Sequence, residues 1–170
     1  MSRGAGEFIK LTGKGRMKDW DPEYQPVLQN FHPGQVIRSY ARTVTESDLV
    51  AFIGFTGMRM PIFIDREYAE KQGPYGERIC PGFLTASVAA GMLESILGRN
   101  VIAGLGMDTL RFVTPVKIGD TLHAIVEIRE ARLTREPGRG MIRAFINTIN
   151  QRGETALEFL ASVLIKADPA

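Results

Sequence analysis

The sequence predicts a single α+β domain in which a curved antiparallel sheet wraps around one long central helix. Nearly every residue of 83–97 is apolar or small and only Glu94 is charged, so a helix here would be covered on most of its surface. After residue 100 the pattern changes to an alternation of period two, which is typical of strands. The order of strand, short helices, long helix and four strands indicates an α+β domain with an antiparallel sheet.

The length of 170 residues fits one domain, and we expect no second one. Residues 31–170 are predicted to form this domain. Residues 1–30 are predicted to be a partly disordered N-terminal extension, because they are polar, punctuated by Gly and Pro and without hydrophobic period. The extension has basic residues but no apolar segment of a secretory signal, so we interpret it as a Gly-rich tail, with a transit peptide as the alternative.

The composition excludes several function classes. The net charge is only +2, from 21 basic and 19 acidic residues scattered along the chain, so we expect no nucleic acid partner. One cysteine and two histidines provide neither an internal disulfide nor zinc-ligand spacing, so we expect no metal and a reducing, cytoplasmic setting. The central apolar run is shorter than the roughly 20 residues that cross a bilayer, so we expect no membrane partner.

The first elements are predicted from local patterns. Residues 36–44 (VIRSYARTV) are rich in β-branched and aromatic residues and follow a Pro-Gly turn signal, which indicates a strand. Residues 45–48 (TESD) have the pattern of a capping box and open a short helix that ends at Gly57. Residues 58–64 (MRMPIFI) are interrupted by a proline, so a packed loop is predicted rather than a central strand. Asp65 is expected to cap a second short helix at 66–72.

The central helix has marked ends. Pro81 suits its first helical position, and Gly98 suits the residue just past its end, where a left-handed conformation is favoured. Gly82 and Phe83 place free backbone N–H groups at its start, where the helix dipole also favours negative charge. A carbonyl or an anion is therefore a plausible ligand for this end of the helix.

Four further strands are predicted after the central helix. They span 102–113, 121–133, 141–150 and 155–165, with turn signals between them. Two glycines inside the first of these strands predict a bulge or a close approach of another backbone. Residues 121–133 alternate most clearly, with Leu, Ala, Val and Ile on one face.

Two motifs make the prediction more specific. Residues 111–122 (RFVTPVKIGDTL) are similar to the RF-x-x-PV-x-x-GD-x-L run common in hot-dog proteins that handle acyl thioesters. Residues 55–69 (FTGMRMPIFIDREYA) and 75–82 (YGERICPG) resemble MaoC-like acyl dehydratases, also called R-specific enoyl-CoA hydratases, which read roughly LTGD-x-NPIH-x-D-x-x-YA and FG-x-RI-x-HG. The resemblance covers about residues 33–165 and implies the hot-dog fold.

The catalytic dyad of this family is replaced. In the family pattern, the Asp after Thr-Gly and the His after Asn-Pro-Ile activate water and deliver a proton across the double bond of a CoA thioester. Here Thr56 and Gly57 match, but Met58 stands at the Asp position, Met60 at the Asn position and Phe63 at the His position. A thioether and a phenyl ring cannot exchange a proton, and positioned acid–base groups supply about 10²–10⁴-fold in rate. The catalytic residues are therefore unknown, and ordinary hydration by this dyad is not expected.

The resemblance also suggests how a thioester binds. It implies that the Gly82 N–H, with Phe83 beside it, donates to the thioester carbonyl; the alternative is an ordinary first turn of a tightly packed helix. Met58, Met60 and Phe63 are expected to line an apolar acyl pocket, or alternatively to fill the core where a catalytic site has been lost.

Polar side chains near these motifs have simpler explanations. Arg59 is a candidate contact for a substrate carboxylate or a CoA phosphate, with a plain surface arginine as the alternative. Asp65 is expected to act as a helix cap, and Glu67 and Glu77 are expected to be solvated or ion-paired. Cys80 precedes a helix start, but no base is close to it in sequence, so we expect an inert buried thiol.

Two hypotheses for function remain open at this stage. The first is an acyl-CoA or acyl-carrier thioester-handling protein of fatty acid metabolism, a lyase that hydrates or dehydrates through a non-standard site and needs no cofactor beyond its CoA substrate. The second is a non-catalytic hot-dog subunit that binds the thioester and pairs with a catalytic MaoC-like partner. Thioester hydrolysis ranks last, because the central helix offers only Glu94, far from its start. The resemblance implies a homodimer or a heterodimer of hot-dog chains, with the pocket at the interface.

Overall fold

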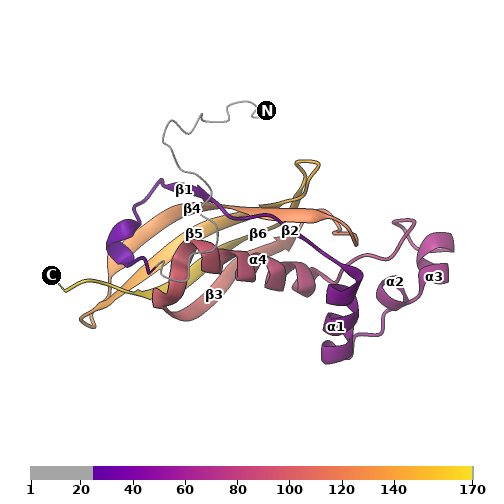
Figure 1. Cartoon of the computed structure of the whole chain (residues 1–170), viewed down its shortest axis with the longest axis horizontal. Coiled ribbons are helices and arrows are strands. Elements are labelled where there is room, and N and C mark those ends of the chain that lie inside the picture. Colours follow the sequence, from indigo (N-terminus) through magenta and orange to yellow (C-terminus); the bar gives the residue numbers. More distant parts are fainter. Residues whose placement is uncertain (1–24, 170) are drawn as a thin grey trace.

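The structure, a computed structural model, describes residues 25–169. Most of the predicted N-terminal extension, residues 1–24, lies outside the described residues. Figure 1 shows long strands curving over one side of the long helix α4, with the short helices α1, α2 and α3 beyond one end of the sheet. The elements in chain order are η1 (Leu28–Asn30), β1 (Val36–Arg38), β2 (Arg42–Thr43), α1 (Glu46–Thr56), α2 (Pro61–Ile64), α3 (Arg66–Lys71), α4 (Gly82–Leu97), η2 (Gly98–Asn100), β3 (Val101–Phe112), β4 (Thr121–Leu133), β5 (Arg139–Ile149) and β6 (Thr155–Lys166).

The six strands form one antiparallel sheet in the order β1-β4-β5-β6-β3, with β2 also paired to β4. The predicted α+β domain with an antiparallel sheet around one helix is confirmed. Along β4 the buried side chains alternate with half-buried ones, as the period of two requires. The buried face carries the predicted apolar residues Leu122, Ala124, Val126 and Ile128.

Helix α4 lies in the core as predicted. Its buried residues are Leu84, Thr85, Ala86, Val88, Ala89, Met92, Leu93, Ile96 and Leu97. Two details of the prediction were wrong. Pro81 has φ −53° and ψ 139°, so it precedes the helix as N-cap and Gly82 is the first helical residue. Gly98 ends the helix, and its N–H donates to the Glu94 carbonyl, but with φ 63° and ψ −162° it is not in the predicted left-handed conformation; this positive-φ, extended-ψ backbone is one that glycine adopts without steric cost.

The predicted strand at 36–44 is split into β1 and β2, so its prediction as one continuous strand was wrong. The break is at Ser39, which is buried. Its N–H donates to the Ala124 carbonyl at 2.9 Å, while its Oγ accepts from the Ala124 N–H at 2.8 Å. The Ser39 hydroxyl oxygen thus takes the place of a main-chain acceptor. It accepts from the Ala124 N–H and interrupts the ladder of main-chain hydrogen bonds between the strands.

Helix α1 begins and ends where the sequence predicts. The Thr45 Oγ1 accepts from the Asp48 N–H at 3.3 Å, and the Asp48 Oδ2 accepts from the Thr45 N–H at 2.8 Å, which is a complete capping box. Gly57 closes the helix in the left-handed conformation, with φ 70°.

Residues 58–78, here called the arm, project from the end of the sheet beyond the start of α4 (Figure 1). The predicted packed loop at 58–64 is wrong in part, because Pro61 opens the one-turn helix α2, a position where its missing N–H costs nothing. Asp65 caps α3 as predicted, since its Oδ1 accepts from the Tyr68 N–H at 3.0 Å.

Among the strands of residues 25–169, β3 lies at an edge of the sheet and pairs with β6 alone. Its register shifts at three places, between Val101 and Ala103, Gly104 and Gly106, and Asp108 and Arg111, which confirms the predicted bulge. Several of its apolar side chains are exposed: Val101, Ile102, Leu105, Met107 and Phe112.

A tight contact between η1 and β5 provides a test of the packing. Leu28 is buried, and a Cβ added to Gly140 would lie 2.5 to 2.7 Å from three Leu28 side-chain carbons. We expect Gly140→Ala to lower the free energy of unfolding by about 1–3 kcal/mol, because one extra methyl overpacks this site. Chemical denaturation measures the change.

Two variants sharpen this test. Leu28→Ala in the Gly140→Ala background removes the clash, so the double variant is expected to lose less than the sum of the single changes. Gly54→Ala in helix α1 is the matched control, because a Cβ there meets nothing within 4 Å and alanine is the better helix former. A Gly140→Ala protein as stable as the unmodified chain would contradict the packing described.

Candidate functional site

The start of α4 presents two free backbone donors. Within residues 25–169, neither the Gly82 N–H nor the Phe83 N–H has a hydrogen-bond acceptor. The preceding segment is fixed, because the Cys80 N–H donates to the Val116 carbonyl at 2.7 Å and Ile79 forms a β-bridge with Lys117. The two donors therefore have defined positions and lie where the helix dipole favours a partial negative charge.

An aromatic pair stands beside these donors. The ring of Phe112, the last residue of β3, packs directly against Gly82, so a Cβ there would lie 2.8 Å from three ring carbons. The Phe83 ring meets the Phe112 ring edge to face, with centroids 5.8 Å apart and an angle of 76°. Residue 82 must therefore be glycine unless the Phe112 ring moves.

The arm carries the predicted acyl-pocket residues and lies at the same end of the molecule as the start of α4 (Figure 1). Met58 and Phe63 are half-buried, whereas Met60 is 59% exposed. The Ile62 carbonyl accepts from the Ile79 N–H at 3.4 Å, which holds α2 beside the segment that leads into α4. All three predicted pocket residues thus belong to a segment that is anchored next to the donors.

Most of the charged side chains on the arm are paired. Glu77 accepts from Lys117 at 2.7 Å, and Arg78 donates to both carboxylate oxygens of Glu46 at 2.7 and 2.8 Å. Glu67 pairs with Lys71 one helical turn away. These contacts confirm the ion-pair expectation for the two glutamates. Arg59 is exposed and forms no ion pair with any residue of the described chain.

Cys80 is a buried thiol, as predicted. Burial first, and the negative charge of Asp120 second, raise the pKa of Cys80 to about 12. The thiol is therefore protonated at neutral pH and unsuited to act as a nucleophile. Among residues 25–169, no group of three or more His, Cys, Asp or Glu side chains is placed to hold a metal ion. No helix in that range is long and apolar enough to cross a membrane.

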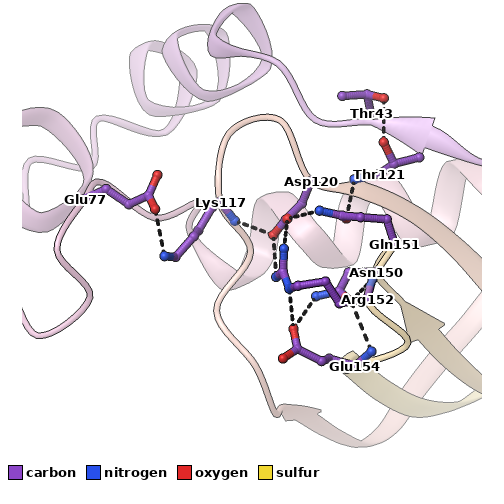
Figure 2. A network of polar contacts seen from close by, with 9 residues as sticks. All are labelled: Thr43, Glu77, Lys117, Asp120, Thr121, Asn150, Gln151, Arg152 and Glu154. Carbon is purple, nitrogen blue, oxygen red and sulfur yellow. Dashed lines mark hydrogen bonds and ion pairs between the residues drawn. The ribbon is translucent and has the colours of Figure 1, made fainter.

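A buried carboxylate, missed by sequence reasoning, ties the site to the sheet. Figure 2 shows Asp120 facing Arg152 and Gln151 from the turn between β5 and β6. Its Oδ1 accepts from the Gln151 Nε2 and the Arg152 Nη1, both at 2.7 Å, and its Oδ2 accepts from the Lys117 N–H at 3.0 Å. Because Val116 in the same turn holds Cys80, this network fixes the segment that leads to Gly82. The only signal in the sequence was the Gly-Asp pair of the 111–122 motif.

Comparison with known proteins identifies the family. Residues 28–145 match the family model of the MaoC like domain. The chain belongs to the MaoC-like dehydratase family. It is 35% identical over 99 residues to Protein MaoC of Klebsiella aerogenes, a match that covers 58% of this chain and 29% of that protein. The chain thus spans less than a third of the length of this relative.

Two further relatives of this MaoC-like chain bear on fold and activity. It is 29% identical over 133 residues to an (R)-specific enoyl-CoA hydratase of Rhodospirillum rubrum, covering 76% of this chain and 85% of that protein. A Mycobacterium tuberculosis protein, RV0216, which has a double hot-dog fold, superposes with a TM-score of 0.74 at 25% identity, covering 85% of this chain and 45% of that one. The predicted hot-dog fold is confirmed.

Proposed function

We propose that this MaoC-like chain binds acyl thioesters, on CoA or on an acyl carrier, and presents them to a second MaoC-like chain that carries the Asp and His. The proposal rests on one combination: free backbone donors at Gly82 and Phe83, with Met58 and Phe63 at the positions of the two proton-transferring residues. A thioester carbonyl can be held at such a site, but these two side chains cannot move a proton.

The chemistry of binding follows from the donors and the arm. Two N–H groups at a helix start polarise a thioester carbonyl and stabilise the enolate that forms when charge moves onto its oxygen. Met58, Met60 and Phe63 offer apolar surface for the acyl chain, and thioethers adapt to irregular shapes. The exposed Arg59 is available for a phosphate or a carboxylate of the ligand.

The exposed edge strand β3 is an argument for a partner chain. Strand β3 leaves one row of backbone groups unpaired by any other strand of the described chain, and its exposed side chains include Leu105 at 55% and Met107 at 44%. Val113, just after the strand, is 54% exposed. An edge that combines free backbone groups with exposed apolar side chains is suited to pairing with another sheet. The partner in this proposal is another hot-dog chain that carries the Asp and His, because a second copy of this chain would bring Met58 and Phe63 again.

Hydration or dehydration by this chain itself, through a non-standard site, is the second candidate. It is favoured by the 29% identity to the R. rubrum (R)-specific enoyl-CoA hydratase and by the matching residues Pro61, Asp65 and Gly82. Its substrate would be a trans-2-enoyl thioester, and its acid–base group would differ from the family dyad.

A matched pair of variants tests the role of the Gly82 N–H. Both contain Phe112→Ala, which makes room for a Cβ at residue 82; one adds Gly82→Ala and the other Gly82→Pro. Proline lacks the N–H yet suits a first helical position, and the extended ψ of 139° at Pro81 accepts a following proline. We expect the proline variant to bind crotonyl-CoA about tenfold more weakly, the effect of one lost hydrogen bond. Isothermal titration calorimetry measures both affinities, and equal values would exclude this N–H as a donor.

A further inference from the structure

The Phe112 ring lies close enough to the donors to touch a bound acyl group. It occupies the volume that a side chain on residue 82 would fill, 2.8 Å from the position of a Cβ. It is also 48% exposed, and Phe83, which meets it edge to face, is 59% exposed. The ring therefore packs against Gly82 and is also partly exposed at the start of α4, where the Gly82 and Phe83 N–H groups have no acceptor among residues 25–169.

The backbone at the end of β3 positions the Phe112 ring. Thr109 has φ 53°, which is unfavourable for a β-branched residue, and it lies in the bulge between Asp108 and Arg111. Bulges re-aim the side chains that follow them. Directly after Phe112 in the chain, the Val113 N–H donates to the Ala156 carbonyl at 2.9 Å and holds the backbone against β6. The backbone that carries the ring is thus held by a strained bulge before Phe112 and a hydrogen bond after it.

The bond lengths of a thioester allow its α-carbon to lie near this ring. A carbonyl oxygen that accepts from the Gly82 N–H lies about 2.9 Å from the nitrogen. The α-carbon and the sulfur are each two covalent bonds from that oxygen; with the acyl side turned toward β3, the substituents of the α-carbon come within van der Waals reach of atoms packed on Gly82, at roughly 4 Å. A flat, conjugated acyl group can lie along the exposed part of an aromatic ring. A methyl branch on the α-carbon stays in the plane of the conjugated group but widens it at the atom nearest Gly82, where the ring is already packed.

We propose that Phe112 determines acyl specificity at this site. It admits thioesters with an unbranched α-carbon, such as straight-chain 2-enoyl thioesters, and disfavours those with an α-methyl branch. This inference rests on the proposed function, since it concerns the same thioester site. It adds the substrate class that the site selects and the residue that selects it.

The test compares crotonyl-CoA with tigloyl-CoA, which differs from it by one methyl group on the α-carbon. Calorimetry gives the dissociation constant of each for the unmodified chain and for Phe112→Ala. We expect the unmodified chain to favour crotonyl-CoA about tenfold, the usual discrimination for one methyl in a packed site, and Phe112→Ala to bind the two almost equally. Phe145→Ala is the control, because Phe145 lies on the sheet face away from α4, between the buried residues Ala144 and Ile146.

The outcomes separate this inference from the proposed function. Crotonyl-CoA binding with the same preference in Phe112→Ala as in the unmodified chain would overturn the role of Phe112 and leave the thioester site standing. An unmodified chain without preference between the two esters would do the same. Binding of neither ester would overturn both. If Phe112→Ala fails to fold by circular dichroism, Phe112→Leu fills most of the volume and is expected to show an intermediate preference; an unchanged one there contradicts the inference.

Discussion

Met58→Asp/Phe63→His is expected to turn this chain into a hydratase of crotonyl-CoA. The two substitutions restore the acid–base pair at positions where the surrounding framework is retained, including Pro61, Asp65 and the Gly82 N–H. Positioned acid–base groups contribute about 10²–10⁴-fold in rate, so the expected gain over the unmodified chain is at least about 10²-fold. The loss of enoyl absorbance measures it.

The control keeps size and polarity but removes proton transfer. Met58→Asn/Phe63→Gln has similar side chains that neither accept nor release a proton near neutral pH, so it is expected to stay at the level of the unmodified chain. Equal activity of the two double variants would contradict the account. So would a folded Asp/His variant that binds crotonyl-CoA without turnover, because the arm would then not bring these positions to the thioester.

Asp120→Asn is expected to cause a large loss of stability. The carboxylate accepts from Gln151, Arg152 and the Lys117 N–H, and it is only 3% exposed. An amide replaces one accepting oxygen by a donating NH₂ group, which leaves buried donors without an acceptor. We expect the free energy of unfolding to fall by about 3 kcal/mol. Chemical denaturation measures it, and the exposed Asp168→Asn is the matched control.

The loss of stability in Asp120→Asn depends on pH, and the pKa of Asp120 determines the direction of that dependence. Burial alone would raise the pKa of Asp120, but hydrogen bonds from Arg152, Lys117 and Gln151 outweigh it and hold the pKa below its ordinary value. The stabilisation is therefore complete above the unfolded pKa of about 4 and is lost as the pH falls through the lower folded pKa. The stability difference between Asp120→Asn and the unmodified chain is expected to shrink below about pH 4. A difference that grows on acidification would contradict this assignment.

Local signals predicted much of this fold. The capping box at Thr45 and Asp48, the helix end at Gly57, the cap at Asp65 and the alternation of β4 are each decided by neighbours in sequence, and all were found as expected. The burial of most of helix α4 was predictable for a related reason, since its many apolar residues need cover, although Phe83, Ser87, Gly91 and Glu94 stay exposed along one face.

The features that were missed depend on contacts between distant segments. The break at Ser39 requires Ala124 opposite it, and the Asp120 network requires Arg152 to return across a hairpin. The contact between Phe112 and Gly82 depends on a bulge that bends the end of a strand toward a helix 30 residues earlier in the chain. None of these partners can be inferred from spacing, because the register of the sheet sets them.

Binding without turnover is the central claim, and one experiment on the unmodified chain tests it most directly. Crotonyl-CoA is titrated into the purified protein by calorimetry, and the enoyl absorbance of the same samples is followed over time. The account predicts saturable binding while the absorbance declines only at the rate of the protein-free solution. Hydration well above that rate would contradict it and favour a non-standard acid–base group in this chain, and an absence of binding would reject the thioester site itself.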